Sequence, residues 1–420
     1  MPSTLASGET IELLMELGFP VNEFTLDSPT LGVLDEDYLD GTLIGDDVSP
    51  YMQGVTTTRG RQDDFSFFSA GRLRATLRND DRRFDPTNTS SPYWNPTTGR
   101  SGVTPRRKVT LICQGVTIFT GRITDIDIEY DNNPGGTSTV IVEAADDFAI
   151  LSTSFISVNT IPSSELSSDR VNTILDLPEV DYPLAQRDID TGVTTLGTQQ
   201  INANRNVLSY LQQVAESEWG LLFMTASGDV GFRARQTAVF SNPEAYFNDD
   251  GTGLPYQVLE ILYGSEFLYN RVQVTRESGT VQTAEDLVSQ AEYGILTYSL
   301  TDQLFAADSQ SLELAEYLRD TYSFPTFWFD QIATPANQLQ AADRVTLYNL
   351  DMGSQIQLTR HFPNGTPTTV SETYSIERLA HTITSQNHLV SIGLYKPEIV
   401  FPFELDDVVY GVLDADNALT

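Results

Sequence analysis

Apolar and polar residues alternate along several short segments in the first third of the chain, and this alternation restricts the fold more than any other feature. Leu73-Arg-Ala-Thr-Leu-Arg78 carries an apolar side chain at every second position, as a strand with one buried face requires. Arg122–Tyr130 repeats the pattern, and the turn-forming stretch Asp131–Gly136 follows it. Short strands separated by turns predict an all-β unit, a barrel or a sandwich, over residues 51–155.

A second group of patterns predicts individual elements in the rest of the chain. Gln114-Gly115 is expected to be a hairpin turn between the strands Lys108–Cys113 and Val116–Thr120, and Arg122–Tyr130 is expected to be a separate strand. Apolar residues recur with helical spacing in three segments: 167–176, 204–217 and 312–318. A further helix start is predicted at Thr283–Asp286, which resembles a capping box. Strands are predicted at 10–17, 269–275, 344–347, 355–359, 373–384 and 389–395, and a hairpin is predicted from 221–225 and 230–233.

These elements predict a β-rich α+β fold with two β-barrel-like domains, inserted small α+β domains and extended terminal arms. The expected boundaries are an N-terminal arm with a first strand (1–50), a first β-barrel domain (51–155), a small α+β domain (156–240), a mixed α/β domain (241–335), a second β-barrel-like region (336–400) and a C-terminal docking tail (401–420).

The formal net charge of −34 over 420 residues limits the choice of partners, because such a field repels nucleic-acid phosphate and anionic membranes. Residues 59–108 are an exception and carry a net charge of +6. This segment is expected to face an acidic part of the same chain or an acidic surface of another subunit; nucleic-acid binding is the least favoured alternative. The arginines of this basic patch are Arg59, Arg61, Arg72, Arg74, Arg78, Arg82 and Arg83.

Residues with the potential for chemistry form no strong catalytic pattern, since the nucleotide-binding loops, the nucleophile elbow and the H-E-x-x-H motif are all missing from the sequence. His361, His381 and His388 allow a three-histidine metal site, but we favour histidines on strand faces or at the surface. Cys113 lies in an apolar run and is expected to be a buried, inert thiol. We therefore expect no enzymatic activity, no cofactor and no metal.

Two aspartate-rich stretches raise the separate possibility of calcium binding. Asp35-Glu-Asp37 and Asp131-Asn-Asn133 offer oxygen ligands, but neither fits the full EF-hand loop. Solvated turns are therefore the favoured interpretation of both.

One short sequence occurs near both ends of the chain. Residues 24–37 read FTLDSPTLGVLDED and residues 403–416 read FELDDVVYGVLDAD, with eight identities in fourteen positions. One interpretation is independent selection of good turn residues. The other is that both are extended segments that dock in similar grooves on neighbouring subunits or on a ring partner, with glycine allowing close backbone approach. The docking residues would be Leu26, Asp27, Gly32, Val33, Leu34, Asp35, Leu405, Asp406, Gly411, Val412, Leu413 and Asp414.

The stretch Thr58–Pro86 resembles the minor tail, or tail hub, proteins of long-tailed, siphovirus-like phages. The similar positions are Gly60, Arg61, Ala70, Gly71, Leu77, Asn79, Arg83, Phe84 and Pro86. Three further pairs of segments resemble the same family in the same order: 107–112 with 118–123, 214–223 with 227–233, and 269–276 with 281–294.

This resemblance implies a structural virion protein at the tail tip, similar to the baseplate hub of contractile-tail phages and assembled in the host cytoplasm. It implies a homotrimeric ring that joins the tail tube or distal tail protein to a central fibre or spike. The lumen would pass the tape measure protein and then DNA, as cargo only, without membrane insertion of the protein. The alternatives are a hexameric distal tail protein, a tail-associated cell-wall hydrolase and a receptor-binding protein.

Overall fold

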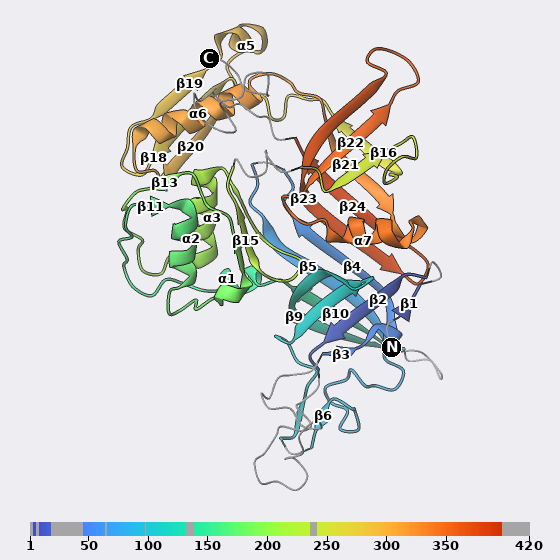
Figure 1. The fold of residues 1–420 in the computed structure, drawn as a ribbon. Coiled ribbons are helices and arrows are strands. Elements are labelled where there is room, and N and C mark those ends of the chain that lie inside the picture. The colour runs from blue at the N-terminus through green and yellow to red at the C-terminus, as the bar shows by residue number, and fades with distance from the viewer. Residues whose placement is uncertain are drawn as a thin grey trace.

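The computed structural model describes residues 3–5, 8–17, 45–63, 65–96, 98–131, 138–235 and 242–396, and the structural statements below concern these residues. Most of the regular structure is antiparallel β-sheet with a few short helices, so the predicted β-rich α+β class is confirmed. The chain forms two β units and two smaller α+β units, which lie beside the β units on the left of Figure 1.

The first β unit is built from the N-terminal segments. Its strands follow the spatial order β1 (Ser3–Thr4), β2 (Thr10–Met15), β8 (Lys108–Cys113), β9 (Val116–Tyr130), β10 (Ser138–Ala145), β5 (Ser69–Arg78) and β4 (Met52–Gly60), and β3 (Asp46–Asp47) pairs with β2. Every second residue of β5 is buried, including Leu73, Ala75 and Leu77, as the alternation predicts. The 3-10 helix η1 (Ser49–Tyr51) directly precedes β4. The connection between β5 and β8 contains a short antiparallel pair of strands, β6 (Trp94–Asn95) and β7 (Arg100–Ser101).

Strand β9 corrects the sequence prediction, because it is one continuous strand where two were expected. Its register shifts against β8 near Ile118 and against β10 near Thr124. Each shift is a bulge, which adds one residue and reverses which side chains point inward. The apolar pattern therefore changes phase twice along β9, and this change looked like a strand break in the sequence.

The second β unit continues the same sheet. Strand β4 pairs antiparallel with β23 from Gly54↔Thr384 to Gly60↔Arg378, so one 14-stranded sheet runs through both units. Figure 1 shows β4 and β23 side by side where the units meet. The strands of this unit are β23 (Thr369–Thr384), β24 (His388–Tyr395), β21 (Trp328–Pro335), β17 (Val258–Leu262), β22 (Gln355–His361) and β16 (Ala245–Asn248).

Helix α7 (Ala341–Asn349) corrects a second prediction, because a strand was expected at 344–347. Its buried residues Arg344, Leu347 and Tyr348 follow helical spacing. A window of four residues is too short to separate this spacing from strand alternation. The short 3-10 helix η3 (Ala336–Gln338) precedes α7.

The first α+β unit follows β10 and shares the hydrophobic core of the β units. The predicted helices are present as α2 (Ser167–Leu175) and α3 (Val207–Glu218), and the predicted hairpin as β14 (Leu221–Met224) and β15 (Val230–Arg233). The remaining elements are α1 (Phe148–Leu151), β11 (Glu165–Leu166), η2 (Leu184–Gln186), β12 (Arg187–Ile189) and β13 (Thr195–Leu196).

The second α+β unit has a hydrophobic core of its own, in which α6 packs on a three-stranded sheet. Its elements are β18 (Arg271–Arg276), β19 (Gln282–Glu285), α5 (Leu287–Tyr293), β20 (Thr297–Gln303) and α6 (Asp308–Tyr322). The expected capping box at Thr283 is wrong, since Thr283 belongs to β19. Asp286 caps α5 instead, by accepting hydrogen bonds from the N–H groups of Val288 and Ser289.

Arg59 on β4 lies where the two β units and the first α+β unit meet. Its side chain is 5% exposed, and its Nη1 donates to Asp351 Oδ1 at 2.7 Å and to the carbonyl oxygen of Met224 at 3.3 Å. Asp351, in the turn before β22, accepts the N–H of Ala226 on its other oxygen at 2.7 Å. One ion pair therefore connects β4, the β14–β15 hairpin and the second β unit.

We expect Arg59→Met to lower the free energy of unfolding by about 3 kcal/mol, because it leaves Asp351 without its cation at a buried junction. Arg74→Met is the matched control. Arg74 also pairs with an acid, Glu143, but the two side chains are 55% and 42% exposed, and loss of such a pair costs about 0–1 kcal/mol. Urea denaturation followed by circular dichroism measures both variants, and equal effects would contradict the role given to Arg59.

Asp146, directly after β10, is a buried carboxyl that holds two backbone N–H groups. Its Oδ2 accepts from Gly71 at 2.7 Å and its Oδ1 from Phe148 at 3.1 Å. Burial raises the pKa of Asp146 to about 7, against the opposing effect of these hydrogen bonds. A Cβ atom at position 71 would lie 2.7 Å from Asp146 Oδ2 and 2.8 Å from Arg59 Cγ, so only glycine fits there.

The pKa of Asp146 predicts a pH-dependent stability difference between the wild type and Asp146→Asn. An unfolded Asp titrates near pH 4, so between about pH 4 and 7 the folded wild type binds more protons than the unfolded chain. Its stability relative to the variant should therefore fall as the pH rises, by about 3 kcal/mol between pH 5 and pH 8. Denaturation of both proteins across this range tests the expectation, and a difference that does not change with pH would exclude it.

Candidate functional site

The repeated segments 24–37 and 403–416 lie outside the described residues. The hypothesis that they dock on neighbouring subunits or on a ring partner therefore remains a prediction. The same holds for the calcium alternative at Asp35–Asp37.

The basic patch of the sequence is divided between an internal junction and the surface. Arg59 is buried against Asp351, and Arg61 forms a bidentate pair with Glu377 on β23. Arg72, Arg74 and Arg78 are exposed on the outward face of β5. The acid partners of the remaining paired arginines are Glu143 for Arg74, Asp80 for Arg78, Asp85 for Arg82 and Asp81 for Arg83. Arg59 and Arg61 are thus largely buried in internal ion pairs, and contact of the five others with another subunit remains a prediction.

The three histidines do not form one site. His361 at the end of β22 is exposed, and its Nδ1 lies 2.6 Å from Asp249 Oδ1. His381 on β23 and His388 on β24 are buried neighbours, with 3.0 Å between Nδ1 of the first and Nε2 of the second. The three-histidine alternative is therefore wrong, and the favoured placement on strands is confirmed. Cys113 is fully buried, as the sequence predicts, and burial raises the pKa of its thiol.

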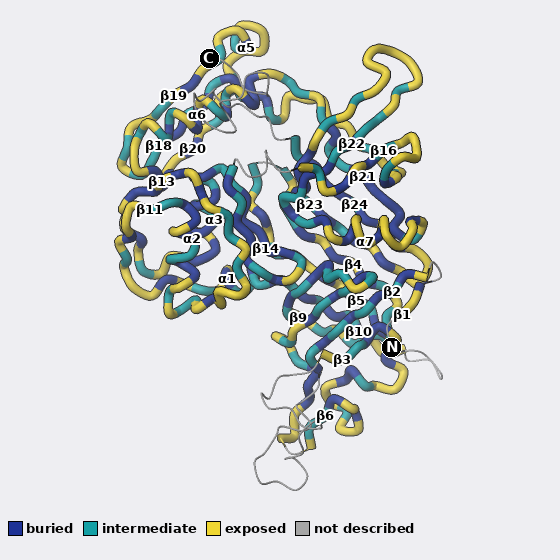
Figure 2. Tube along the Cα trace, in the orientation of Figure 1, coloured by how far each residue is buried: buried dark blue, intermediate teal, exposed yellow. Residues whose placement is uncertain are grey.

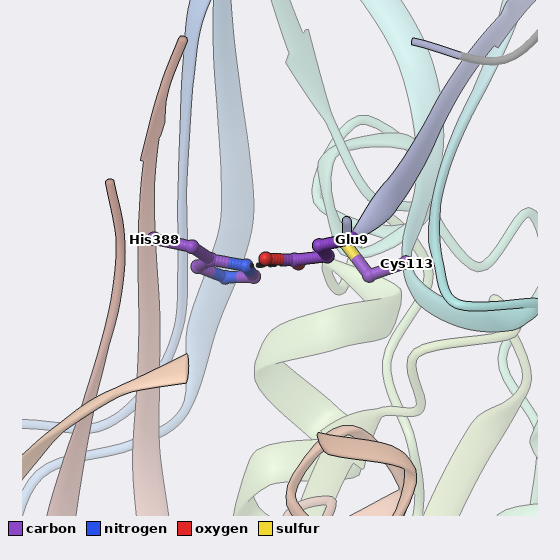
Figure 3. Close-up of side chains that lie close together, drawn as sticks. All are labelled: Glu9, Cys113 and His388. Atoms are coloured by element: carbon purple, nitrogen blue, oxygen red, sulfur yellow. Dashed lines mark hydrogen bonds and ion pairs between the residues drawn. The ribbon is translucent and has the colours of Figure 1, made fainter. Parts of the chain in front are cut away.

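A buried polar cluster joins the start of the first β unit to the second. Glu9, just before β2, faces the ring of His388, as Figure 3 shows. Glu9 Oε1 lies 2.6 Å from His388 Nδ1 and accepts the hydroxyl hydrogen of Tyr348, on α7, at 2.6 Å. Cys113, at the end of β8, lies on the other side of Glu9. The cluster connects residues up to 379 positions apart, and no local pattern in the sequence indicates it.

The electrostatics of this cluster favour an ionised Glu9 beside a neutral His381. Burial acts to raise the pKa of Glu9, but the hydrogen bond and charge of His388 together with the hydrogen bond from Tyr348 outweigh it and lower that pKa. Burial, together with the charge of His388, holds the pKa of His381 well below its ordinary value. Burial also raises the pKa of Tyr348, which therefore remains a hydrogen-bond donor.

Phe65, in the connection between β4 and β5, inserts into the second α+β unit. It packs against the core of that unit, which lies more than 200 positions later in the sequence. The rings in contact with it are Trp219, Phe267, Tyr269, Tyr298 and Tyr322, with centroids 4.8–5.8 Å away. This insertion connects the second α+β unit to the first β unit.

A cleft of about 210 Å³ opens beside this connection, between the second α+β unit and the second β unit. Its walls include Arg61, Phe267 and Trp328. Leu262, the last residue of β17, also lines it.

Strand β17 presents an exposed apolar edge that the sequence prediction missed. It pairs with β21 alone among the described strands, and Val258, Ile261 and Leu262 are 40–43% exposed. Tyr263, the next residue, is 69% exposed. An unpaired apolar strand edge is a surface that pairs readily with another chain. The signal in the sequence was the run Val258–Tyr263, in which Glu260 is the one polar residue, although β17 is not buried.

A second exposed apolar surface surrounds α5, where the tube in Figure 2 is mainly coloured as exposed. Leu287 and Val288 are each 71% exposed, and Ile295, two residues after the helix, is 59% exposed. Neighbouring apolar side chains with this exposure mark contact surfaces in many proteins. No helix among the described residues is long and apolar enough to cross a membrane.

The architecture is similar to that of solved phage tail proteins. The 43 kDa tail protein of prophage MuSo2 from Shewanella oneidensis matches with a TM-score of 0.57 at 12% identity, covering 92% of this chain and 98% of that protein. A tail protein from Neisseria meningitidis MC58 matches with a TM-score of 0.56 at 8% identity, covering 92% and 96%. No family model and no curated protein sequence matches the chain.

These matches define the class of fold: the chain has the fold of phage tail proteins over nearly its whole length. The resemblance found in the sequence is therefore confirmed for the fold. At 8–12% identity the matches do not transfer individual residues or partners.

We expect Phe65→Ala to destabilise the protein by about 3 kcal/mol, because it removes a ring from the centre of an aromatic cluster. The loss should appear as faster amide hydrogen exchange in β18–β20, while the first β unit remains protected. Phe67→Ala is the control in the same connection. Phe67 is 49% exposed, so its loss should leave exchange in β18–β20 unchanged. Equal exchange in the two variants would exclude an anchoring role for Phe65.

Proposed function

We propose that this protein is a structural component of a phage tail, and more specifically the tail hub at the tail tip. The proposal is carried by one observation, the match to a solved tail protein over 92% of this chain and 98% of that protein. Subunits would form a trimeric ring that joins the tail tube or distal tail protein above to a central fibre or spike below. The protein would be non-enzymatic and would act from the assembled virion tail.

Two surfaces of the described structure support a role in assembly. The apolar edge of β17 and the apolar surface around α5 are exposed in a single chain, and subunit contacts in a ring would bury such surfaces. The continuous sheet through β4 and β23 gives each subunit a rigid body.

The charge of the chain supports a role as a conduit. A lumen lined by part of the net charge of −34 would repel DNA phosphate, so DNA would pass without binding after the tape measure protein. The repeated segments 24–37 and 403–416 fit the same proposal. A threefold hub below a sixfold ring needs two similar contacts per subunit, and two copies of one sequence would provide them.

The mass of the purified protein, measured by light scattering over a range of protein and salt concentrations, tests the proposal. We expect a trimer, or a monomer–trimer equilibrium, of the 46.5 kDa chain. A hexamer would favour the distal tail protein instead. A strict monomer at all concentrations would contradict a self-assembling ring and would direct attention to cell-wall hydrolysis and receptor binding.

The same measurement on a chain lacking residues 403–420 tests the docking hypothesis. The truncated chain should lose trimers or binding to a distal tail protein. If both are unchanged, the C-terminal copy of the repeated segment does not dock.

A further inference from the structure

We propose that Glu9, Cys113 and His388 bind one zinc ion, which fastens the start of the first β unit to the second β unit. This inference goes beyond the role in the tail and differs from the sequence expectation of no metal. The three residues come from the segment before β2, the end of β8 and the start of β24. Each is 0% exposed, and one potential ligand atom from each lies within 4.8 Å of the other two.

The chemistry of these ligands fits zinc. A thiolate, an imidazole and a carboxylate are the ligand types that zinc takes in proteins, whereas calcium and magnesium bind oxygen alone. Zinc–ligand distances of about 2.0–2.3 Å place neighbouring ligand atoms about 3.3–3.8 Å apart. The three ligand atoms lie at most 4.8 Å apart, which exceeds this range by about 1 Å. The 2.6 Å between Glu9 Oε1 and His388 Nδ1 is shorter than this range, and this distance must increase by about 1 Å when zinc binds.

A second observation points to the same ion. Glu9 Oε2 is buried and has no hydrogen-bond partner among the described residues. An unsatisfied oxygen on a buried carboxylate costs free energy and calls for an explanation. If Glu9 binds through both oxygens, this atom becomes the fourth ligand, beside Glu9 Oε1, Cys113 Sγ and His388 Nδ1.

The surrounding hydrogen bonds would orient these ligands. Metal-binding histidines usually donate their other ring N–H to a fixed acceptor, and His388 Nε2 lies 3.0 Å from Nδ1 of the buried His381. Tyr348 donates its hydroxyl hydrogen to Glu9 at 2.6 Å and fixes the carboxylate. The ligands and the groups that hold them therefore come from both β units and from α7.

The charges also balance. The Glu9 carboxylate and the Cys113 thiolate together carry −2, which neutralises Zn²⁺ within the buried site. Binding would release two protons to solvent, the thiol proton of Cys113 and the proton between Glu9 Oε1 and His388 Nδ1. The remaining ring hydrogen of His388, on Nε2, would donate to His381 Nδ1, and His381 would hold its own hydrogen on Nε2.

Cobalt substitution of the full chain tests the site directly. We expect the wild-type protein, refolded with Co²⁺ and then dialysed, to retain one ion per chain and to show a cobalt–thiolate charge-transfer band. Because Cys113 is the only cysteine, this band can arise from no other site in the chain. Folded wild-type protein without retained metal or without the band would overturn the proposal, whatever the variants do.

Variants separate binding from folding. Cys113→Ser should abolish the band, and Glu9→Gln should reduce cobalt retention at least tenfold while preserving side-chain shape. His361→Gln is the matched control, since His361 is exposed and pairs with Asp249. That variant should retain the ion and the band. Retention of the band in Cys113→Ser would also exclude the site.

Discussion

The ion pair between Arg59 and Asp351 is the interaction on which the arrangement of the units depends. A buried guanidinium requires a partner, and this one takes a carboxylate from the second β unit and a carbonyl oxygen from the first α+β unit. The close contact of Gly71 with Arg59 and Asp146 shows how little space remains around it. The paired strands β4 and β23 then extend the junction into one sheet, which positions the surfaces available for assembly.

Prediction from the sequence succeeded where local patterning decides structure. The alternation in β5 and the apolar stripe of α3 each reflect a face buried against the core. It failed where tertiary context decides. Bulges changed the phase of β9, and α7 offered too few residues to reveal its period. The exposed run of β17 was visible in the sequence, but its unpaired edge follows only from the position of β21.

The buried polar sites show the same limit more strongly. The sequence grouped the histidines by proximity along the chain, whereas the fold separates His361 and joins His388 to Glu9 and Cys113. It grouped the arginines by net charge, whereas the fold largely buries two of them, Arg59 and Arg61, in internal ion pairs and leaves others at the surface. Residue type and spacing therefore identified groups with chemical potential, and only the pairing of distant strands determined which of them meet.

The long strand β23 has a mechanical consequence. Its 16 residues pair with β22 near one end and with β4 near the other, and β24 accompanies it over most of its length. A load applied to either β unit is borne by many backbone hydrogen bonds in shear, which break together and not one by one. The two units therefore move little relative to each other under load. Any widening of an assembly of such subunits requires neighbouring subunits to slide past one another.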